Sequence, residues 1–176
     1  MVADHLACFT PKAGDGIFLP AGTVHAFGSG VVLFEVQQNS DVTFRLYDWD
    51  RVDASTSQLR TLQVEQAMAC IDFSQQALVP VLPAMEETTP VARERLFECE
   101  YFSLWRLRGN VPFSVGAAGV ARLVVCIGRT GQVEHRGASY YMEPGGVLLP
   151  PAVLGPCLFR PRGEVSVLEV ALPHSL

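Results

Sequence analysis

Short apolar runs separated by glycine-containing turns dominate the first fifty residues of the chain. The runs are rich in β-branched and aromatic residues, and they fall at residues 6–9, 17–19, 31–37 and 42–47. Glycine turns between β-rich runs at this spacing are typical of a jelly-roll or barrel sheet. We therefore predict extended strands up to residue 47, followed by an exposed polar connection at residues 48–60.

One segment in the middle of the chain has the period of a helix. Val64, Met68 and Ile71 fall at positions i, i+4 and i+7, and polar residues occupy the intervening positions. This pattern predicts a short helix over residues 61–73. Residues 76–93 contain three prolines and an acidic, threonine-rich run, which favours an irregular linker.

From residue 94 the pattern of strands and turns returns. The predicted strands are residues 99–106, 111–115, 121–127, 132–135, 139–142, 147–149, 157–160 and 165–172. About eight short strands in a segment of this length predict a complete small jelly roll. The predicted fold class is therefore all-β, with one complete barrel, one partial barrel before it, and one short helix.

An internal repeat relates the two parts of the chain. Residues 13–25, AGDGIFLPAGTVH, align with residues 143–155, EPGGVLLPPAVLG. Pro20 aligns with Pro150, whereas His25 aligns with Gly155. The second copy keeps the turn residues and lacks the histidine, so we expect it to bind no metal.

Composition narrows the classes of function. A net charge of −5 argues against binding of nucleic acid through bulk electrostatics. The sequence contains no apolar stretch long enough for a membrane-spanning helix, which predicts no membrane partner. The five cysteines are widely spaced and form no Cys-x-x-Cys pair. That pattern is typical of reduced thiols, and it predicts a cytoplasmic protein.

Two motifs in the first fifty residues carry a family resemblance. The spacing of Gly14, Pro20, Gly22 and His25 resembles the second metal-binding motif of the cupins, whose fold is a jelly roll also called a double-stranded β-helix. The longer stretches PAGTVHA (residues 20–26) and QQNSDVTFRLYDWDR (residues 37–51) resemble class I mannose-6-phosphate isomerases of the short bacterial type. Beyond these residues the chain fits the carboxy-terminal part of that family more loosely, and it lacks the amino-terminal portion.

The resemblance implies a domain plan and a set of site residues. Residues 1–60 would be the carboxy-terminal part of a first, metal-type cupin, residues 61–93 the helix and proline-rich linker, and residues 94–176 a second, metal-free cupin. The residues implied for the site are His25 as zinc ligand, Arg45 and Glu35 as catalytic residues, and Asn39 and Asp41 as substrate-binding residues that position Arg45.

Each of these residues also has a simpler interpretation. A lone histidine in an apolar strand is often a core or surface residue without a ligand role. Glu35 could be a solvated strand carboxylate. Arg45 lies between apolar neighbours and needs a charged partner, which could be Asp41 or Asp48 instead of a substrate anion.

The leading functional hypothesis is a zinc-dependent aldose–ketose isomerase that interconverts mannose 6-phosphate and fructose 6-phosphate. Catalytic zinc ordinarily takes three protein ligands, and the sequence assigns only His25. We therefore expect the 176 residues alone to have little or no activity, although sugar phosphate could still bind. The alternatives are a non-catalytic cupin that binds sugar or a partner protein, and a subunit that completes another chain's site. The apolar face of half a barrel also predicts packing against the second barrel or a homodimer.

Overall fold

The computed structural model describes residues 2–173, and the chain divides into two compact units, Met1–Pro80 and Val81–Leu176. The first unit contains the 3-10 helix η1 (Val2–His5) and the helix α1 (Val64–Cys70). The second unit contains the 3-10 helix η2 (Ala152–Leu154) and the strands β1 (Ala84–Glu87), β2 (Ala92–Glu98), β3 (Ser103–Gly109), β4 (Phe113–Val115), β5 (Arg122–His135), β6 (Ala138–Met142), β7 (Val147–Leu148) and β8 (Cys157–Ala171). No helix among the described residues is long and apolar enough to cross a membrane.

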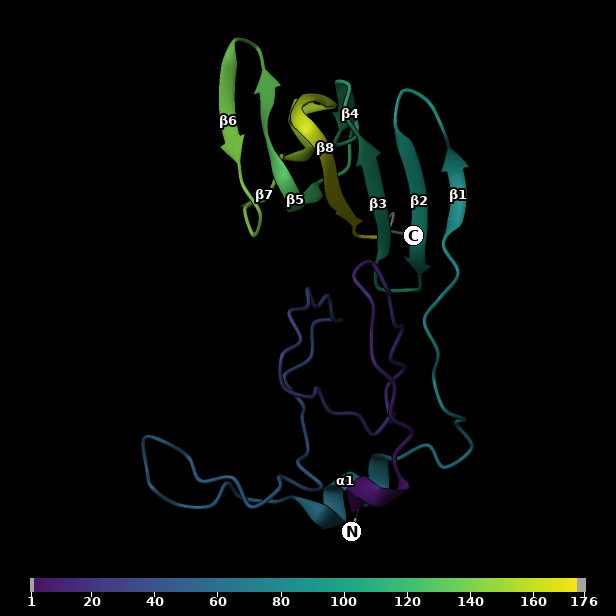
Figure 1. Ribbon diagram of the computed structural model, residues 1–176, viewed down its shortest axis with the longest axis vertical. Helices are drawn as coiled ribbons and strands as arrows, with labels where there is room; N and C mark the ends of the chain where they lie inside the picture. Colours follow the sequence, from purple (N-terminus) through teal and green to yellow (C-terminus); the bar gives the residue numbers. More distant parts are fainter. Residues whose placement is uncertain (1, 174–176) are drawn as a thin grey trace. The chain divides into compact units, whose positions relative to one another are not determined.

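The second unit is a single eight-stranded antiparallel sheet built around β8. The strand order is β1-β2-β3-β8-β5-β6, with β4 paired to β8 and β7 paired to β5 (Figure 1). Strand β8 pairs with β3 along residues Ser103–Gly109 and with β5 from Arg122 to Glu134. The β5 pairing contains bulges near Gly128, which let a long strand bend and twist. Because β8 pairs with β3 on one side and with β5 on the other, it is a central strand of the sheet.

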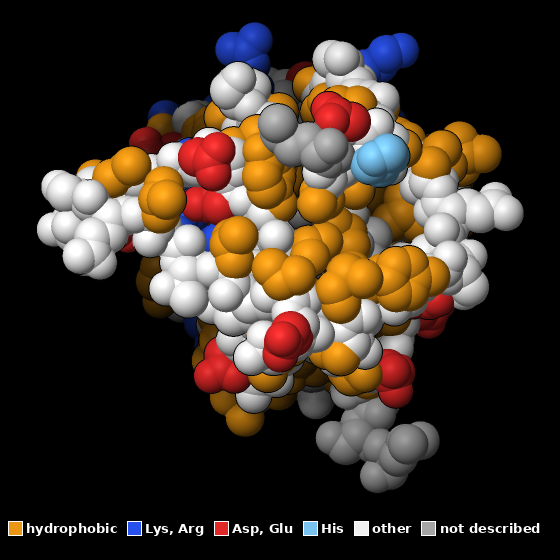
Figure 2. Space-filling model, turned by 90° about the horizontal axis from the view of Figure 1, so that it is seen from below, with side chains coloured by type: hydrophobic (Ala, Val, Ile, Leu, Met, Phe, Trp, Pro, Cys, Tyr) orange, Lys and Arg blue, Asp and Glu red, His pale blue; other side chains and the backbone are white. Residues whose placement is uncertain are grey.

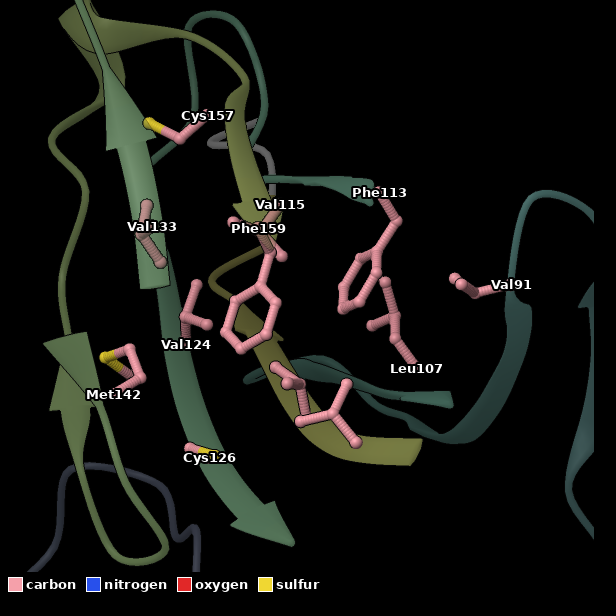
Figure 3. Close-up of a cluster of buried hydrophobic side chains, with 12 residues drawn as sticks. Val91, Leu107, Phe113, Val115, Val124, Cys126, Val133, Met142, Cys157 and Phe159 are labelled. Atoms are coloured by element: carbon pink, nitrogen blue, oxygen red, sulfur yellow. The ribbon is translucent and has the colours of Figure 1, made fainter. Parts of the chain in front are cut away.

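Alternation of apolar side chains along β5 and β8 produces the core. Residues two apart on a strand point to the same face, so Val165 and Val167 of β8 face the same side as Val124 and Cys126 of β5. Phe159 is fully buried and stacks on Phe113 with ring centroids 5.0 Å apart. Figure 3 shows the Phe159 ring between the side chains of Val124 and Phe113. This buried cluster holds the sheet together.

Two glycines are required by close approach or backbone conformation. A Cβ on Gly131 would lie 2.4 Å from the Phe159 ring and 2.7 Å from the carbonyl oxygen of Arg160, so no larger residue fits between β5 and β8. Gly155, which aligns with His25 in the internal repeat, has a φ of 67° and ends η2. A β-carbon is disfavoured in that conformation, so turn geometry explains the glycine at this position.

The sequence predicted most strands of the second unit, but it missed β2, and the strand predicted at 99–106 begins in the turn before β3. The all-β class with one short helix is confirmed. The predicted pairs of strands 121–127 with 132–135, and 157–160 with 165–172, are each one continuous strand, β5 and β8. The prediction of an irregular linker at residues 76–93 was wrong in part, because β1 and the first residues of β2 lie there. The predicted helix over 61–73 is confirmed as the shorter α1.

The first unit differs more from the expectation. Among residues 2–80 the structure has no regular strand, so the strands predicted at 6–9, 17–19, 31–37 and 42–47 were wrong. The β-type pairing described within residues 2–80 is an isolated antiparallel bridge between Val52 and Leu59. Strands need partners for their backbone N–H and C=O groups, and no neighbouring strand among residues 2–80 supplies them.

Large hydrophobic side chains remain exposed in this first unit. Phe27 is 54% exposed and Val42 is 66% exposed, and Val32 is fully exposed. Figure 2 shows one face of the molecule on which hydrophobic side chains gather, with separate acidic side chains among them. An apolar surface of this kind is typical of an interaction site. The exposed side chains are compatible with the predicted homodimer, which stays a prediction.

Candidate functional site

The motif turn that precedes His25 is fixed by the end of α1. Gly22 has a φ of 84°, and a Cβ there would lie 2.8 Å from the carbonyl oxygen of Cys70. The backbone N–H of Asp72 donates to the carbonyl oxygen of Gly22 at 3.1 Å. The Thr23 hydroxyl also bonds to the side chain of Gln75. The glycine of the motif is therefore needed for this turn to dock on the residues that follow the helix.

His25 follows this turn with its ring exposed. Its Nδ1 lies 2.9 Å from the carbonyl oxygen of Thr23, and its ring meets the Phe27 ring edge-on at a centroid distance of 5.8 Å. A carbonyl oxygen can only accept, so Nδ1 carries the proton in this contact. In the neutral imidazole the lone pair is then on Nε2. This is the arrangement in which metal-ligating histidines are usually held.

The remaining acidic and amide candidates are exposed. Glu35, Asn39 and Asp41 all lie at the surface of the first unit. Among residues 2–173, no hydrogen bond or ion pair joins Glu35 to His25 or Arg45. The structure therefore places these side chains in water and does not bring the predicted site together around a common contact.

Arg45 is the candidate with the best-defined surroundings. Its backbone N–H donates to the Gln63 side-chain oxygen at 2.8 Å, and the Gln63 N–H donates to the Arg45 carbonyl oxygen at 2.9 Å. Its Nη1 donates to the carbonyl oxygen of Thr61 at 3.3 Å. Its Nε lies 3.8 Å from the Asp48 carboxylate, and the side chain is 33% exposed. The residue before α1 thus positions this arginine through the backbone.

Asp48 is the buried centre of this region, and sequence reasoning assigned it no site role. It is 5% exposed, and three guanidinium groups surround its carboxylate. Arg60 donates from both Nε and Nη2, and Arg51 donates from Nη2 at 2.8 Å. Hydrogen bonds from Arg60, followed by those from Arg51, hold the pKa of Asp48 below its usual value of 3.8 although burial opposes the shift.

One carboxylate among three arginines leaves this cluster with a positive charge. We call Arg45, Asp48, Arg51 and Arg60 the arginine cluster. The ion pair between Arg45 and Asp48 that the sequence offered as a simpler interpretation is present, at the long distance of 3.8 Å. Asp48 makes its closer contacts with Arg51 and Arg60, so Arg45 is only partly neutralised. No local pattern marks this cluster, because Arg60 lies 12 residues from Asp48.

The described residues do not fit a zinc site by themselves. Among residues 2–173, no group of three or more His, Cys, Asp or Glu side chains lies close enough together to hold a metal ion. Zinc in catalytic sites ordinarily takes three protein ligands and keeps one position open. His25, with Nε2 available, suits one of the three positions. His25 alone does not make a zinc site.

Comparison with known proteins finds similarity to mannose-6-phosphate isomerases. Mannose-6-phosphate isomerase ManA of Bacillus subtilis is 41% identical over 106 residues, which cover 56% of this chain and 31% of that protein. The mannose-6-phosphate isomerase of Streptococcus mutans is 31% identical over 175 residues, which cover 98% of this chain and 52% of that protein. A probable mannose-6-phosphate isomerase of B. subtilis, GmuF, is 32% identical over 146 residues, covering 82% of this chain and 45% of that protein.

The comparison of structures gives the fold. The crystal structure of the mannose 6-phosphate isomerase from B. subtilis matches 75% of this chain and 41% of its own length, with a TM-score of 0.64 and 20% identity. The predicted cupin, or jelly-roll, fold is thereby confirmed. No family model matches the chain.

The matched segment is the carboxy-terminal part of these relatives, and the chain spans about half of their length or less. The motifs around His25 and Arg45 and the cupin-type sheet agree with the same family. The chain is related to the mannose-6-phosphate isomerases and corresponds to their carboxy-terminal part.

Proposed function

We propose that this chain is the carboxy-terminal part of a mannose-6-phosphate isomerase. The enzyme would depend on zinc and interconvert mannose 6-phosphate and fructose 6-phosphate. The single observation that carries the proposal is the 41% identity to the B. subtilis isomerase over 106 residues. The cysteine pattern supports a cytoplasmic location as part of the same proposal.

Arg45 is proposed to hold the anionic part of the substrate. Guanidinium groups keep their charge at all relevant pH values and match the oxygens of phosphate. Arg45 is one-third exposed, and it shares Asp48 with two arginines that lie closer to the carboxylate. The arginine cluster therefore has positive charge to offer a phosphate group or a developing enediolate.

His25 and Glu35 are proposed to act at the sugar. Isomerisation moves a proton from C2 to C1 of the sugar through an enediol, and a positioned carboxylate such as Glu35 can relay or orient that transfer. The contact of His25 Nδ1 with Thr23 leaves Nε2 to ligate a metal. Asn39 and Asp41 are proposed to contact substrate beside Arg45.

The second candidate function is a non-catalytic cupin that binds sugar phosphate or a partner. It is favoured by one observation: residues 2–173 contain no group of three metal-ligating side chains. Under this alternative the arginine cluster would bind the sugar phosphate, and zinc would not be needed. A homodimer through the exposed apolar side chains of the first unit is compatible with either function.

Three measurements on the 176-residue chain test these proposals: zinc stoichiometry, calorimetric binding of mannose 6-phosphate, and isomerase turnover. We expect zinc to bind weakly, His25→Ala to abolish that binding, and His5→Ala, an exposed histidine outside the motif, to leave it unchanged. We expect Arg45→Ala to weaken sugar-phosphate binding by about tenfold or more. Arg51→Ala, which removes a more exposed arginine of the same cluster, should have a smaller effect.

The outcomes separate the two functions. Turnover that rises when the segment matching the amino-terminal half of the relatives is supplied, and that is lost in Arg45→Ala, supports the isomerase. Binding of sugar phosphate without turnover in either case supports the binding module. If mannose 6-phosphate does not bind at all, or if Arg45→Ala binds it as well as the unaltered chain, both proposals for this site are wrong.

A further inference from the structure

Four charged or aromatic residues lie together on the core face of the sheet in the second unit. Trp105 of β3 is directly opposite Glu169 of β8, and Glu169 is opposite Val124 of β5. On β5, Arg122 lies two residues before Val124. On β2, Arg93 lies two residues before Arg95, and Arg95 is directly opposite Trp105. Residues two apart share a face, so Arg93, Trp105, Glu169 and Arg122 form a row across four neighbouring strands. We call this row the tryptophan cluster.

Both carboxylate oxygens of Glu169 accept hydrogen bonds within this cluster. Glu169 is 2% exposed, its Oε2 accepts from Arg93 Nη1 at 2.9 Å, and its Oε1 accepts from the backbone N–H of Gly116 at 2.6 Å. Arg93 also lies 3.6 Å from Glu86, whose carboxylate accepts from the Trp105 indole N–H at 2.8 Å. Glu169 and the neighbouring Glu86 thus already have partners, which include Arg93 for both.

Among residues 2–173, Arg122 has no counter-ion in this cluster. Its guanidinium carbon lies 4.8 Å from the centroid of the Trp105 ring, the same distance as that of Arg93. Its Nε and Nη1 are buried, and they have no hydrogen-bond partner within the part of the chain that the structure describes. A guanidinium group cannot lose its proton to relieve this burial. A buried charge without a partner is strongly disfavoured, and stacking on an aromatic ring offsets only part of that cost.

We propose that the tryptophan cluster is a binding site for a small oxyanion, a carboxylate or a phosphate group, held by Arg122 beside Trp105. The cluster lies on the core face, yet Arg122, Trp105 and Arg93 are each only partly buried, so solvent reaches the site. The overall charge of −5 disfavours an extended polyanion such as nucleic acid. The residues of this cluster belong to the unit Val81–Leu176, whereas the isomerase candidates all belong to Met1–Pro80.

Tryptophan fluorescence tests the proposal directly. The chain has two tryptophans, Trp49 and Trp105, so Trp49→Phe leaves Trp105 as the sole reporter. The 176-residue Trp49→Phe chain is titrated with inorganic phosphate, with succinate, and with chloride at matched ionic strength. We expect a saturable change with phosphate or succinate and none with chloride. The anion that responds tells phosphate from carboxylate chemistry.

Two variants assign the response to Arg122. Arg122→Gln should weaken the responding anion by about tenfold to a hundredfold, as expected for loss of hydrogen bonds from a charged group. Arg162→Gln is the matched control, because Arg162 also stacks on an aromatic ring of the same unit, Tyr141 at 5.9 Å. That control should keep the affinity of the parent chain.

A second measurement covers the case in which Arg122→Gln does not fold. The thermal midpoint of the unaltered chain should rise with phosphate or succinate, since a ligand of the folded state stabilises it, and should not rise with chloride. The proposal is overturned if chloride matches both oxyanions in fluorescence and in thermal midpoint. It is also overturned if a folded Arg122→Gln binds the anion as tightly as Arg162→Gln does.

Discussion

Removal of the Glu169 carboxylate should destabilise the second unit more than any surface charge would. Glu169 is 2% exposed and accepts from both Arg93 and the backbone N–H of Gly116. Glu169→Ala takes the acceptor from two partly buried donors, one of them charged, and leaves Arg93 only its longer contact of 3.6 Å with Glu86. Breaking a buried ion pair by removing one partner costs about 3–5 kcal/mol.

The change to glutamine should cost less, because one side-chain oxygen is kept. Glu169→Gln can still accept from Gly116 or from Arg93, and it loses one charged hydrogen bond, worth about 1.5–3 kcal/mol. Glu98→Ala is the matched control on β2. Glu98 is 60% exposed and pairs with Arg95, so its removal should cost about 1 kcal/mol or less.

Urea unfolding monitored by Trp105 fluorescence in the Trp49→Phe background measures these differences. With a slope of about 2 kcal/mol per molar urea, the loss in Glu169→Ala lowers the midpoint by about 2 M. The expected order of stability is the parent chain, Glu98→Ala, Glu169→Gln and then Glu169→Ala. If Glu169→Ala is no less stable than Glu98→Ala, Glu86 or water replaces the carboxylate, and the reasoning from a dedicated buried counter-ion is wrong.

Three further predictions follow from the core and from the arginine cluster. Phe159→Ala should cost about 3–5 kcal/mol in urea unfolding, whereas the exposed Tyr141→Ala should change stability by about 0.5 kcal/mol or less. Gly131→Ala should lower the thermal midpoint or prevent folding, since the new Cβ would lie 2.7 Å from a backbone oxygen; an unchanged midpoint would contradict this. Because the pKa of Asp48 is lowered in the folded chain, its stabilisation is present above pH 3.8 and is lost as the pH falls through the lower folded value. Trp49 fluorescence should report that acid transition, and Asp48→Asn should remove it.

The second unit could be predicted because its strands carry their own pattern. The apolar alternation of β5 and β8 is visible in the sequence, and the turns between them contain glycine. Strand β1 could not be found in this way. All four of its residues are exposed, and it pairs only with β2 at the edge of the sheet. An edge strand without a buried face has no hydrophobic period, so its acidic residues looked like a linker.

The first unit shows the limit of composition as a guide to strands. Residues 31–37 are β-branched and aromatic, but that preference yields a strand only where a neighbouring strand supplies hydrogen-bond partners. Residues 2–80 do not supply them. Long-range contacts escaped prediction for a similar reason. The pairing of Asp48 with Arg60 and that of Arg93 with Glu169 join residues 12 and 76 positions apart, and no local motif encodes them.

The two proposed anion sites belong to different units of the chain, so substitutions can test each of them by itself. The motifs that resemble the isomerases lie in Met1–Pro80, whereas the cupin sheet lies in Val81–Leu176. Arg45 belongs to a cluster whose single carboxylate is shared among three arginines. Arg122 belongs to one whose carboxylate, Glu169, already accepts from Arg93 and Gly116. Both arginines therefore have charge left for an anion, for reasons that do not depend on each other. Substitutions that share no partner combine additively, so Arg45→Ala should leave the Trp105 response intact and Arg122→Gln should leave sugar-phosphate binding intact. Loss of both responses in either single variant would mean that one anion site had been counted twice.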